Sequence, residues 1–130
     1  MPEAREERSA FDREIEAFER HLADERGVSR HTLTAYRSGL ERFEQFLAAF
    51  RGTTADVDLA SIDTLTIRSF LSSLRKDGLS RTSIGRHLSA LRTFFTYLKR
   101  EGRTDANPAK AVAAPRQDRS LPRTLSVPEA

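Results

Sequence analysis

The sequence contains no cysteine and no long apolar run. Without cysteine, disulfide bonds, thiolate zinc sites and cysteine nucleophiles are all excluded. No apolar stretch approaches the roughly 20 residues that a transmembrane helix needs. The N-terminus is charged rather than apolar, so nothing resembles a secretory signal. We therefore expect a cytoplasmic protein without a membrane partner.

Patterns typical of catalysis and of cofactor binding are also missing. The three histidines, His21, His31 and His87, lack the spacing of metal ligands, and we expect them to be exposed and without a specific role. Tyr36 and Tyr97 fall within helical patterns. No glycine-rich loop of the kind that cradles phosphate occurs. The sequence predicts no metal site, no cofactor and no catalytic residue.

Charge is distributed unevenly along the chain. The net charge is +3, but residues 1–26 carry nine Asp or Glu against five Arg, whereas residues 27–130 carry seventeen Lys or Arg against ten Asp or Glu. A basic surface attracts polyanions such as nucleic acids, although ribosome-associated and membrane-surface proteins share this property. The acidic residues of 1–26 indicate a helix that is solvated or faces another subunit.

Apolar residues recur at helical spacing through most of the 130 residues, which predicts one all-α domain. Helices are expected over residues 9–26, 30–49, 64–77 and 81–100, with a loop at 51–62 and at most a short helical turn at 107–112. Phe50 is expected on the apolar stripe of the second helix. Residues 1–10 form a lead-in, 11–113 the helical domain, and 114–130 a basic, proline-containing linker that looks cut off.

Two stretches of the chain repeat one another. Residues 27–47 and 78–98 share seven identities, beginning with Gly-x-Ser-Arg. In each copy a glycine ends one helix, an apolar residue turns the corner, a serine caps the next helix, and an arginine lies on its first turn. Helix N-termini that carry hydroxyl groups and a cation are good anchors for phosphate groups.

The polar faces of the second and fourth helices support the same interpretation. Residues 78–100 contain no Asp or Glu. Cations and short hydroxyl side chains occupy the N-terminal half of each helix, as a helix inserted into a major groove requires. The outer-face residues are Arg30, His31, Thr34 and Ser38, with Arg37 at the edge, and Thr82, Arg86, Ser89 and Thr93. The alternative is a solvated surface, since arginine-rich helices and serine caps are common.

The phenylalanines point to the kind of nucleic acid. Phe43, Phe70, Phe94 and Phe95 fall on or near apolar stripes, so we expect them in the core rather than as stacking platforms for single strands. The sequence therefore favours a duplex as the partner.

In order and spacing, these residues resemble the N-terminal core-binding domain of tyrosine recombinases and phage-type integrases, closest to the Xer type. The resemblance rests on residues 18–29, 32–37, 78–84, 88–95, 107–109 and 121–126. It implies a SAM-like, four- to five-helix orthogonal bundle that forms half of a clamp around double-stranded DNA. It also implies that the first helix meets other recombinase subunits in a synaptic tetramer. The implied DNA-binding residues are Ser29, Arg30, His31, Thr34, Arg37, Ser80, Arg81, Thr82, Arg86 and His87.

The chain also departs from the family's pattern. The family's chemistry uses Arg, Lys, a His-x-x-Arg element and a nucleophilic Tyr in a second domain, but this chain has no His-x-x-Arg and no matching Tyr. We therefore expect DNA binding in recombination, integration or chromosome dimer resolution, without catalysis by this fragment. The alternative is a helical protein–protein interaction module that does not bind DNA.

Overall fold

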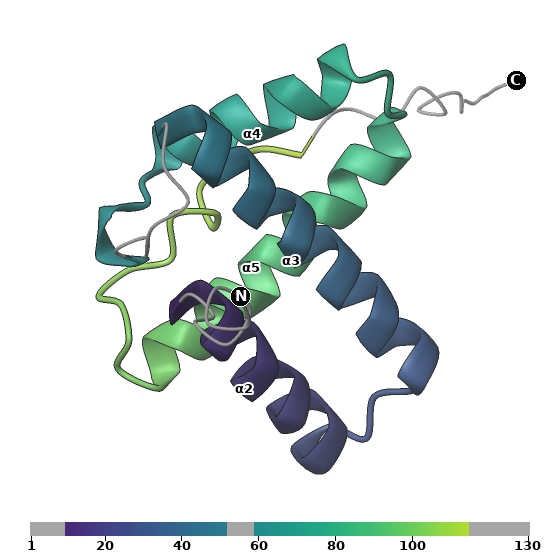
Figure 1. Cartoon of the computed structure of the whole chain (residues 1–130), viewed down its shortest axis with the longest axis vertical. Coiled ribbons are helices and arrows are strands. Elements are labelled where there is room, and N and C mark those ends of the chain that lie inside the picture. Colours follow the sequence, from purple (N-terminus) through teal and green to yellow (C-terminus); the bar gives the residue numbers. More distant parts are fainter. Residues whose placement is uncertain (1–9, 52–58, 115–130) are drawn as a thin grey trace, which may run out of the picture.

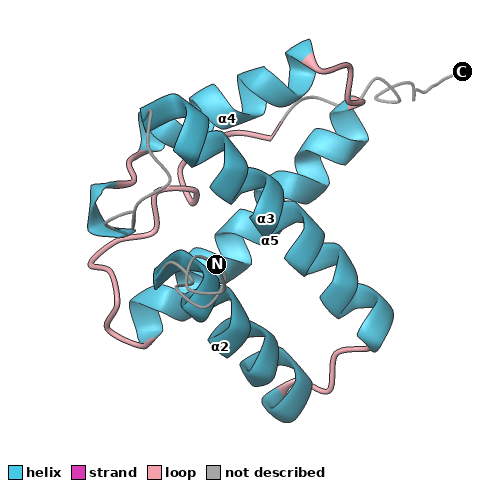
Figure 2. Ribbon diagram, in the orientation of Figure 1, coloured by secondary structure: helices cyan, strands magenta, loops and turns pink. Residues whose placement is uncertain are grey.

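The computed structural model describes residues 10–51 and 59–114, and all regular structure within these ranges is helical. The helices are α2 (Ala10–Glu25), α3 (Arg30–Arg51), α4 (Thr64–Lys76) and α5 (Arg81–Arg100), with one short 3₁₀ helix, η1 (Leu59–Ser61). Figure 2 shows helices and connecting loops, and no strand, in the described part of the chain. The predicted all-α class is confirmed, and the four helix boundaries agree within two residues.

The four helices form two hairpins that cross (Figure 1). Helix α2 packs on α3, α4 packs on α5, and α3 packs on α5 to join the hairpins. The helices approach closely near Gly39, where a Cβ atom would lie 3.7 Å from Cδ2 of His87. From this crossing the N-terminal halves of α3 and α5 diverge on one side of the molecule (Figure 1).

The two hairpin corners have the same local chemistry. Gly27 and Gly78 have φ angles of 62° and 92°, in the left-handed region that favours glycine. Ser29 and Ser80 each accept a hydrogen bond at 3.1 Å from the backbone N–H three residues further on. The repeated glycine stops and serine caps are therefore confirmed, and they turn the chain through equivalent corners.

Replacing Gly78 with alanine should lower the free energy of unfolding by about 1–2 kcal/mol, because an L residue is strained at this φ. Gly85 is the matched control, since it lies inside α5 and an added Cβ meets no atom within 4 Å. Gly85→Ala should raise stability by up to about 1 kcal/mol. Urea denaturation measures both variants. Equal effects of the two substitutions on the free energy of unfolding would show that the left-handed conformation of Gly78 does not require glycine.

Aromatic rings form the centre of the core. Phe94 is fully buried, and its ring centroid lies 5.5 Å from that of Phe11 and 5.3 Å from that of Phe18. The predicted burial of the four phenylalanines named above is confirmed. The expectation for Phe50 is wrong: this residue is 51% exposed, and its ring stacks on that of Phe46 with centroids 5.1 Å apart. Periodicity gives the direction of a side chain, but cannot tell whether another element covers that end of the helix.

Residues 101–114 return along α5 without forming a helix. Arg92 holds this segment, because its guanidinium donates to the carbonyl oxygens of Ala109, at 3.1 Å, and of Val112. Asn107 Nδ2 in turn donates to the carbonyl oxygen of Arg92 at 3.2 Å. The predicted short turn is present, since the N–H of Lys110 donates to the carbonyl of Asn107 at 3.2 Å. Arg92 therefore has a structural role.

Some expectations lie outside the described residues. These are the start at residue 9 of the first expected helix, most of the lead-in and of the loop at 51–62, and the linker, of which only residue 114 is described. At the described end of that loop, Leu59–Ser61 is a 3₁₀ helix rather than irregular loop. None of the described helices is both long and apolar enough to cross a membrane.

Candidate nucleic-acid interface

An open groove of about 440 Å³ lies between the N-terminal halves of α3 and α5. Among the described residues no Asp or Glu lines it, and three of its residues, Ala35, Gly39 and Ala90, have minimal side chains. The remaining lining residues are Thr32, Tyr36, Ser38, Ser83, Arg86, His87 and Ser89. A groove with small side chains, hydroxyl groups and a cation lets a polyanion approach the helices closely.

The structure separates the predicted site residues into two groups. Only Arg86 and His87 line the groove itself. The others, apart from Arg37, are exposed at the two corners and on the adjoining first turns: Ser29, Arg30, His31, Thr34, Ser80, Arg81 and Thr82. The hydroxyl oxygens of the two capping serines already accept backbone hydrogen bonds. The serines therefore shape the corners, whereas the exposed arginines remain candidates for phosphate contact.

Arg37 is engaged by two carboxylates. Its Nε lies 2.9 Å from Oε2 of Glu41, and its Nη1 pairs with Oε1 of Glu19 on α2. The hydrogen bond to Glu41 raises the pKa of the Arg37 guanidinium above its ordinary value, an effect that the pair with Glu19 reinforces. The positive charge is thus balanced within the protein, and Arg37 links α2 to α3.

His87 lies at the crossing of the hairpins. It is half-buried, its Nδ1 is 2.9 Å from the carbonyl oxygen of Ser83, and its ring packs edge-on against Phe70 with centroids 6.1 Å apart. Since a carbonyl oxygen only accepts, Nδ1 carries the proton. His21 is also largely covered, with a side chain 10% exposed. The expectation of exposed histidines is therefore wrong for His21 and His87, because packing between hairpins covers both.

Sequence reasoning missed most of the groove wall. It selected residues opposite the apolar stripes, but the groove lies along the edges of those stripes. Tyr36 stands at such an edge, with its ring 5.8 Å from Phe18 and also lining the groove. One feature of the sequence could have indicated the groove. Gly39 is an isolated glycine inside a helix, and such a glycine often allows another element to pack closely.

Within the described residues, no three His, Cys, Asp or Glu side chains gather into a group that could hold a metal ion.

The crossed hairpins and the groove between them define a small helical domain. Residues 15–102 match a family described as "Phage integrase, N-terminal SAM-like domain". The chain belongs to this family, and the resemblance drawn from its sequence is confirmed.

The chain is similar to several curated proteins named tyrosine recombinase XerC. It is 39% identical to that of Pseudomonas aeruginosa (strain LESB58) over 117 residues, which is 90% of this chain and 37% of the relative. The XerC of Pelobacter propionicus is 38% identical over 117 residues, which is 90% of this chain and 38% of the relative. The XerC of Roseiflexus castenholzii is 39% identical over 113 residues, which is 87% of this chain and 35% of the relative. No solved structure matches the chain significantly. The chain thus spans little more than a third of the length of these relatives.

Proposed function

We propose that this chain binds double-stranded DNA in the groove between α3 and α5, as the N-terminal half-clamp of a tyrosine recombinase. The main observation behind the proposal is the groove itself, which has no Asp or Glu among its described lining residues and is flanked by the first turns of two equivalent helices. The matched relatives, named tyrosine recombinases, support a role in recombination. Such a role places the chain with DNA in the cytoplasm.

In this proposal, affinity comes chiefly from phosphate contacts made by Arg30, Arg81 and Arg86. All three are exposed, and Arg86 also lines the groove. Hydroxyl groups of Ser83 and Ser89 lie on the groove wall, where they face base edges or the backbone. The two capping serines orient the corners, and Arg37 links the helices on either side of the first corner, α2 and α3. The arrangement binds DNA, whereas cleavage requires the family's separate catalytic domain.

The proposal extends to the other subunits of the recombinase assembly. Helix α2 carries the acidic residues that we expect at a subunit contact, but two of them are already used within the domain. Glu14 pairs with Arg103, and Glu19 pairs with Arg37. Near the end of α2, Asp24 is exposed, and Glu25 is exposed as well although one of its oxygens lies 3.3 Å from Nδ1 of His21. We place the subunit contact there.

Salt-dependent binding of a duplex tests the proposed site. Wild-type chain should bind a 20-base-pair duplex weakly, with a dissociation constant of about 10⁻⁴–10⁻⁶ M, and the affinity should fall steeply with salt. Each of Arg30→Gln, Arg81→Gln and Arg86→Gln should reduce the slope of log affinity against log salt by about 0.9, because one phosphate contact is lost. Fluorescence anisotropy at several salt concentrations measures this slope.

The matched control is Arg68→Gln, which removes one exposed charge from α4, away from the groove. It should leave the slope unchanged. A wild-type chain that ignores DNA but binds a protein partner with little salt dependence would instead identify an interaction module, and the proposed function would be wrong.

A further inference from the structure

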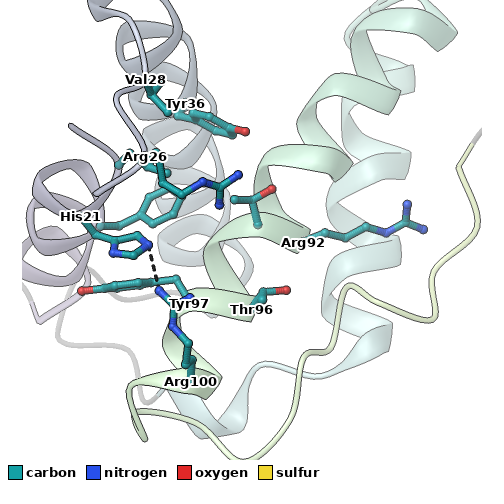
Figure 3. Close-up of a pocket in the computed structure, with 11 residues that line it drawn as sticks. His21, Arg26, Val28, Tyr36, Arg92, Thr96, Tyr97 and Arg100 are labelled. Carbon is teal, nitrogen blue, oxygen red and sulfur yellow. Dashed lines mark hydrogen bonds between the residues drawn. The ribbon is translucent and has the colours of Figure 1, made fainter. Parts of the chain in front are cut away.

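A second cavity, of about 280 Å³, opens where α2, α3 and α5 meet (Figure 3). The aromatic rings of Phe18, Tyr36 and Tyr97 line it, together with the side chains of Arg26 and Arg100. No Asp or Glu from residues 10–51 or 59–114 lines it. The cavity therefore combines an apolar wall with a cationic rim, a combination that the sequence analysis did not predict.

This cavity continues the groove along α5. Tyr36 lines both of them. On α5 the exposed or half-exposed polar side chains follow one another at spacings of three and four residues, which places them on one side of the helix. They run from the groove into the cavity in the order Arg86, Ser89, Thr93, Thr96 and Arg100. At 1.5 Å per residue, this polar stripe is about 21 Å long.

Arg26 reaches the cavity from the first corner. Its side chain is exposed, and Figure 3 shows its guanidinium extending over the cavity toward α5. Arg92 also lines the cavity, but its guanidinium turns away toward the carbonyl groups of residues 109 and 112. Of these two arginines, Arg26 is therefore the one that presents its charge to the cavity.

Arg100 is held in place on the opposite rim. Its Nη2 lies 2.8 Å from Nε2 of His21 (Figure 3). A guanidinium only donates hydrogen bonds, so Nε2 accepts and the imidazole proton is on Nδ1. That Nδ1 faces Oε1 of Glu25 at 3.3 Å. This chain of contacts orients Arg100 before any ligand arrives.

Two carboxylates stand near Arg100 but outside the cavity. Glu25 is linked to Arg100 through the imidazole of His21, and its side chain is 71% exposed. Oε2 of Glu101 is 4.0 Å from Nε of Arg100, and both side chains are about half exposed. Exposed pairs at this distance are weak, so the charge of Arg100 remains available to an anion.

We propose that this cavity binds the sugar–phosphate backbone of the same duplex that occupies the groove. Arg26 and Arg100 each contact a phosphate, and the aromatic wall faces deoxyribose. The inference rests on the proposed DNA binding. An acidic protein segment would meet the same charges, but the continuity of the cavity with the groove through Tyr36 and the polar stripe of α5 favours DNA.

The test compares two sets of variants on the 20-base-pair duplex. Arg26→Gln and Arg100→Gln should each lower the salt slope by about 0.9, and the double variant by about 1.8. Between 50 and 200 mM salt, the fold-loss of affinity should therefore be about 3.5 times smaller for each single variant than for wild type. Arg26→Lys keeps the charge and should keep the slope, whereas Arg68→Gln is the control for a charge removed elsewhere. Thermal unfolding of each variant checks that the fold is intact.

The outcomes separate this inference from the proposed function. If Arg86→Gln lowers the slope while Arg26→Gln and Arg100→Gln do not, the groove binds DNA and the cavity does not. If wild type fails to bind the duplex, the proposed function and this inference both fail. If Arg26→Gln and Arg100→Gln weaken binding of a poly-glutamate peptide but not of the duplex, the cavity serves a protein partner and the inference is overturned.

Discussion

Replacing Phe94 with alanine should lower the free energy of unfolding by about 3–5 kcal/mol. Phe94 is fully buried and packs against Phe11, Phe18 and Phe95, with ring centroids 5.3–5.6 Å apart. These rings come from both ends of the chain's helical region, so the deletion opens a cavity between the hairpins. Because small domains are stable by only about 5–15 kcal/mol, this variant should be close to unfolding. Urea denaturation followed by circular dichroism measures the loss.

Phe50→Ala is the matched control for this substitution. Phe50 is 51% exposed at the end of α3, so the same atoms are removed from a site that is half solvated already. Its loss should cost less than about 1 kcal/mol, since surface substitutions have small effects. Comparable losses for the two variants would mean that the ring cluster around Phe94 does not dominate the core.

Arg92→Met should lower the free energy of unfolding by about 1.5–3 kcal/mol, because the segment that follows α5 loses the charged donor that holds it against the helix. Methionine keeps an unbranched side chain but cannot donate to the carbonyl groups of Ala109 and Val112. Ala109 is fully buried and Val112 is 3% exposed, so water cannot readily replace the lost hydrogen bonds. Hydrogen exchange of the amides of residues 104–112 should accelerate more than that of α3.

Arg86→Met serves as the control on the same helix. Arg86 is exposed, and the groove rather than the protein core surrounds it. Its substitution should change stability by no more than about 0.5 kcal/mol, while it weakens DNA binding. If both arginine variants were equally stable, with unchanged exchange in residues 104–112, the carbonyl contacts of Arg92 would contribute nothing to the fold.

Local signals predicted the helices and their ends well. The glycine stops and serine caps depend on backbone conformation and on hydrogen bonds that span three residues. Asp63 behaves in the same way, since its side chain accepts the N–H of Thr66 at 2.9 Å and caps α4. Such interactions lie within a single turn, so the sequence around each position contains all the partners.

The roles of individual arginines were harder to predict. Arg37, Arg86 and Arg92 all lie on polar or mixed faces of their helices. Among them the sequence distinguishes only Arg37, which has a carboxylate one turn further on, Glu41. Arg37 is balanced by Glu19, 18 positions away, and Arg92 binds carbonyl groups 17 and 20 positions away. Whether an arginine is available to DNA therefore depends on contacts between elements that the helical period does not encode.

The sequence by itself determined an all-α domain, the extents of its four helices, the two equivalent corners and the family resemblance. Each of these follows from composition, from periodicity or from contacts within one turn. Only the tertiary structure decided where α3 crosses α5, which small residues line the groove, and how Arg26 and Arg100 meet across a second cavity. The reason is physical: residues 74 positions apart come together only when two hairpins pack, and packing depends on the shapes of both surfaces at once.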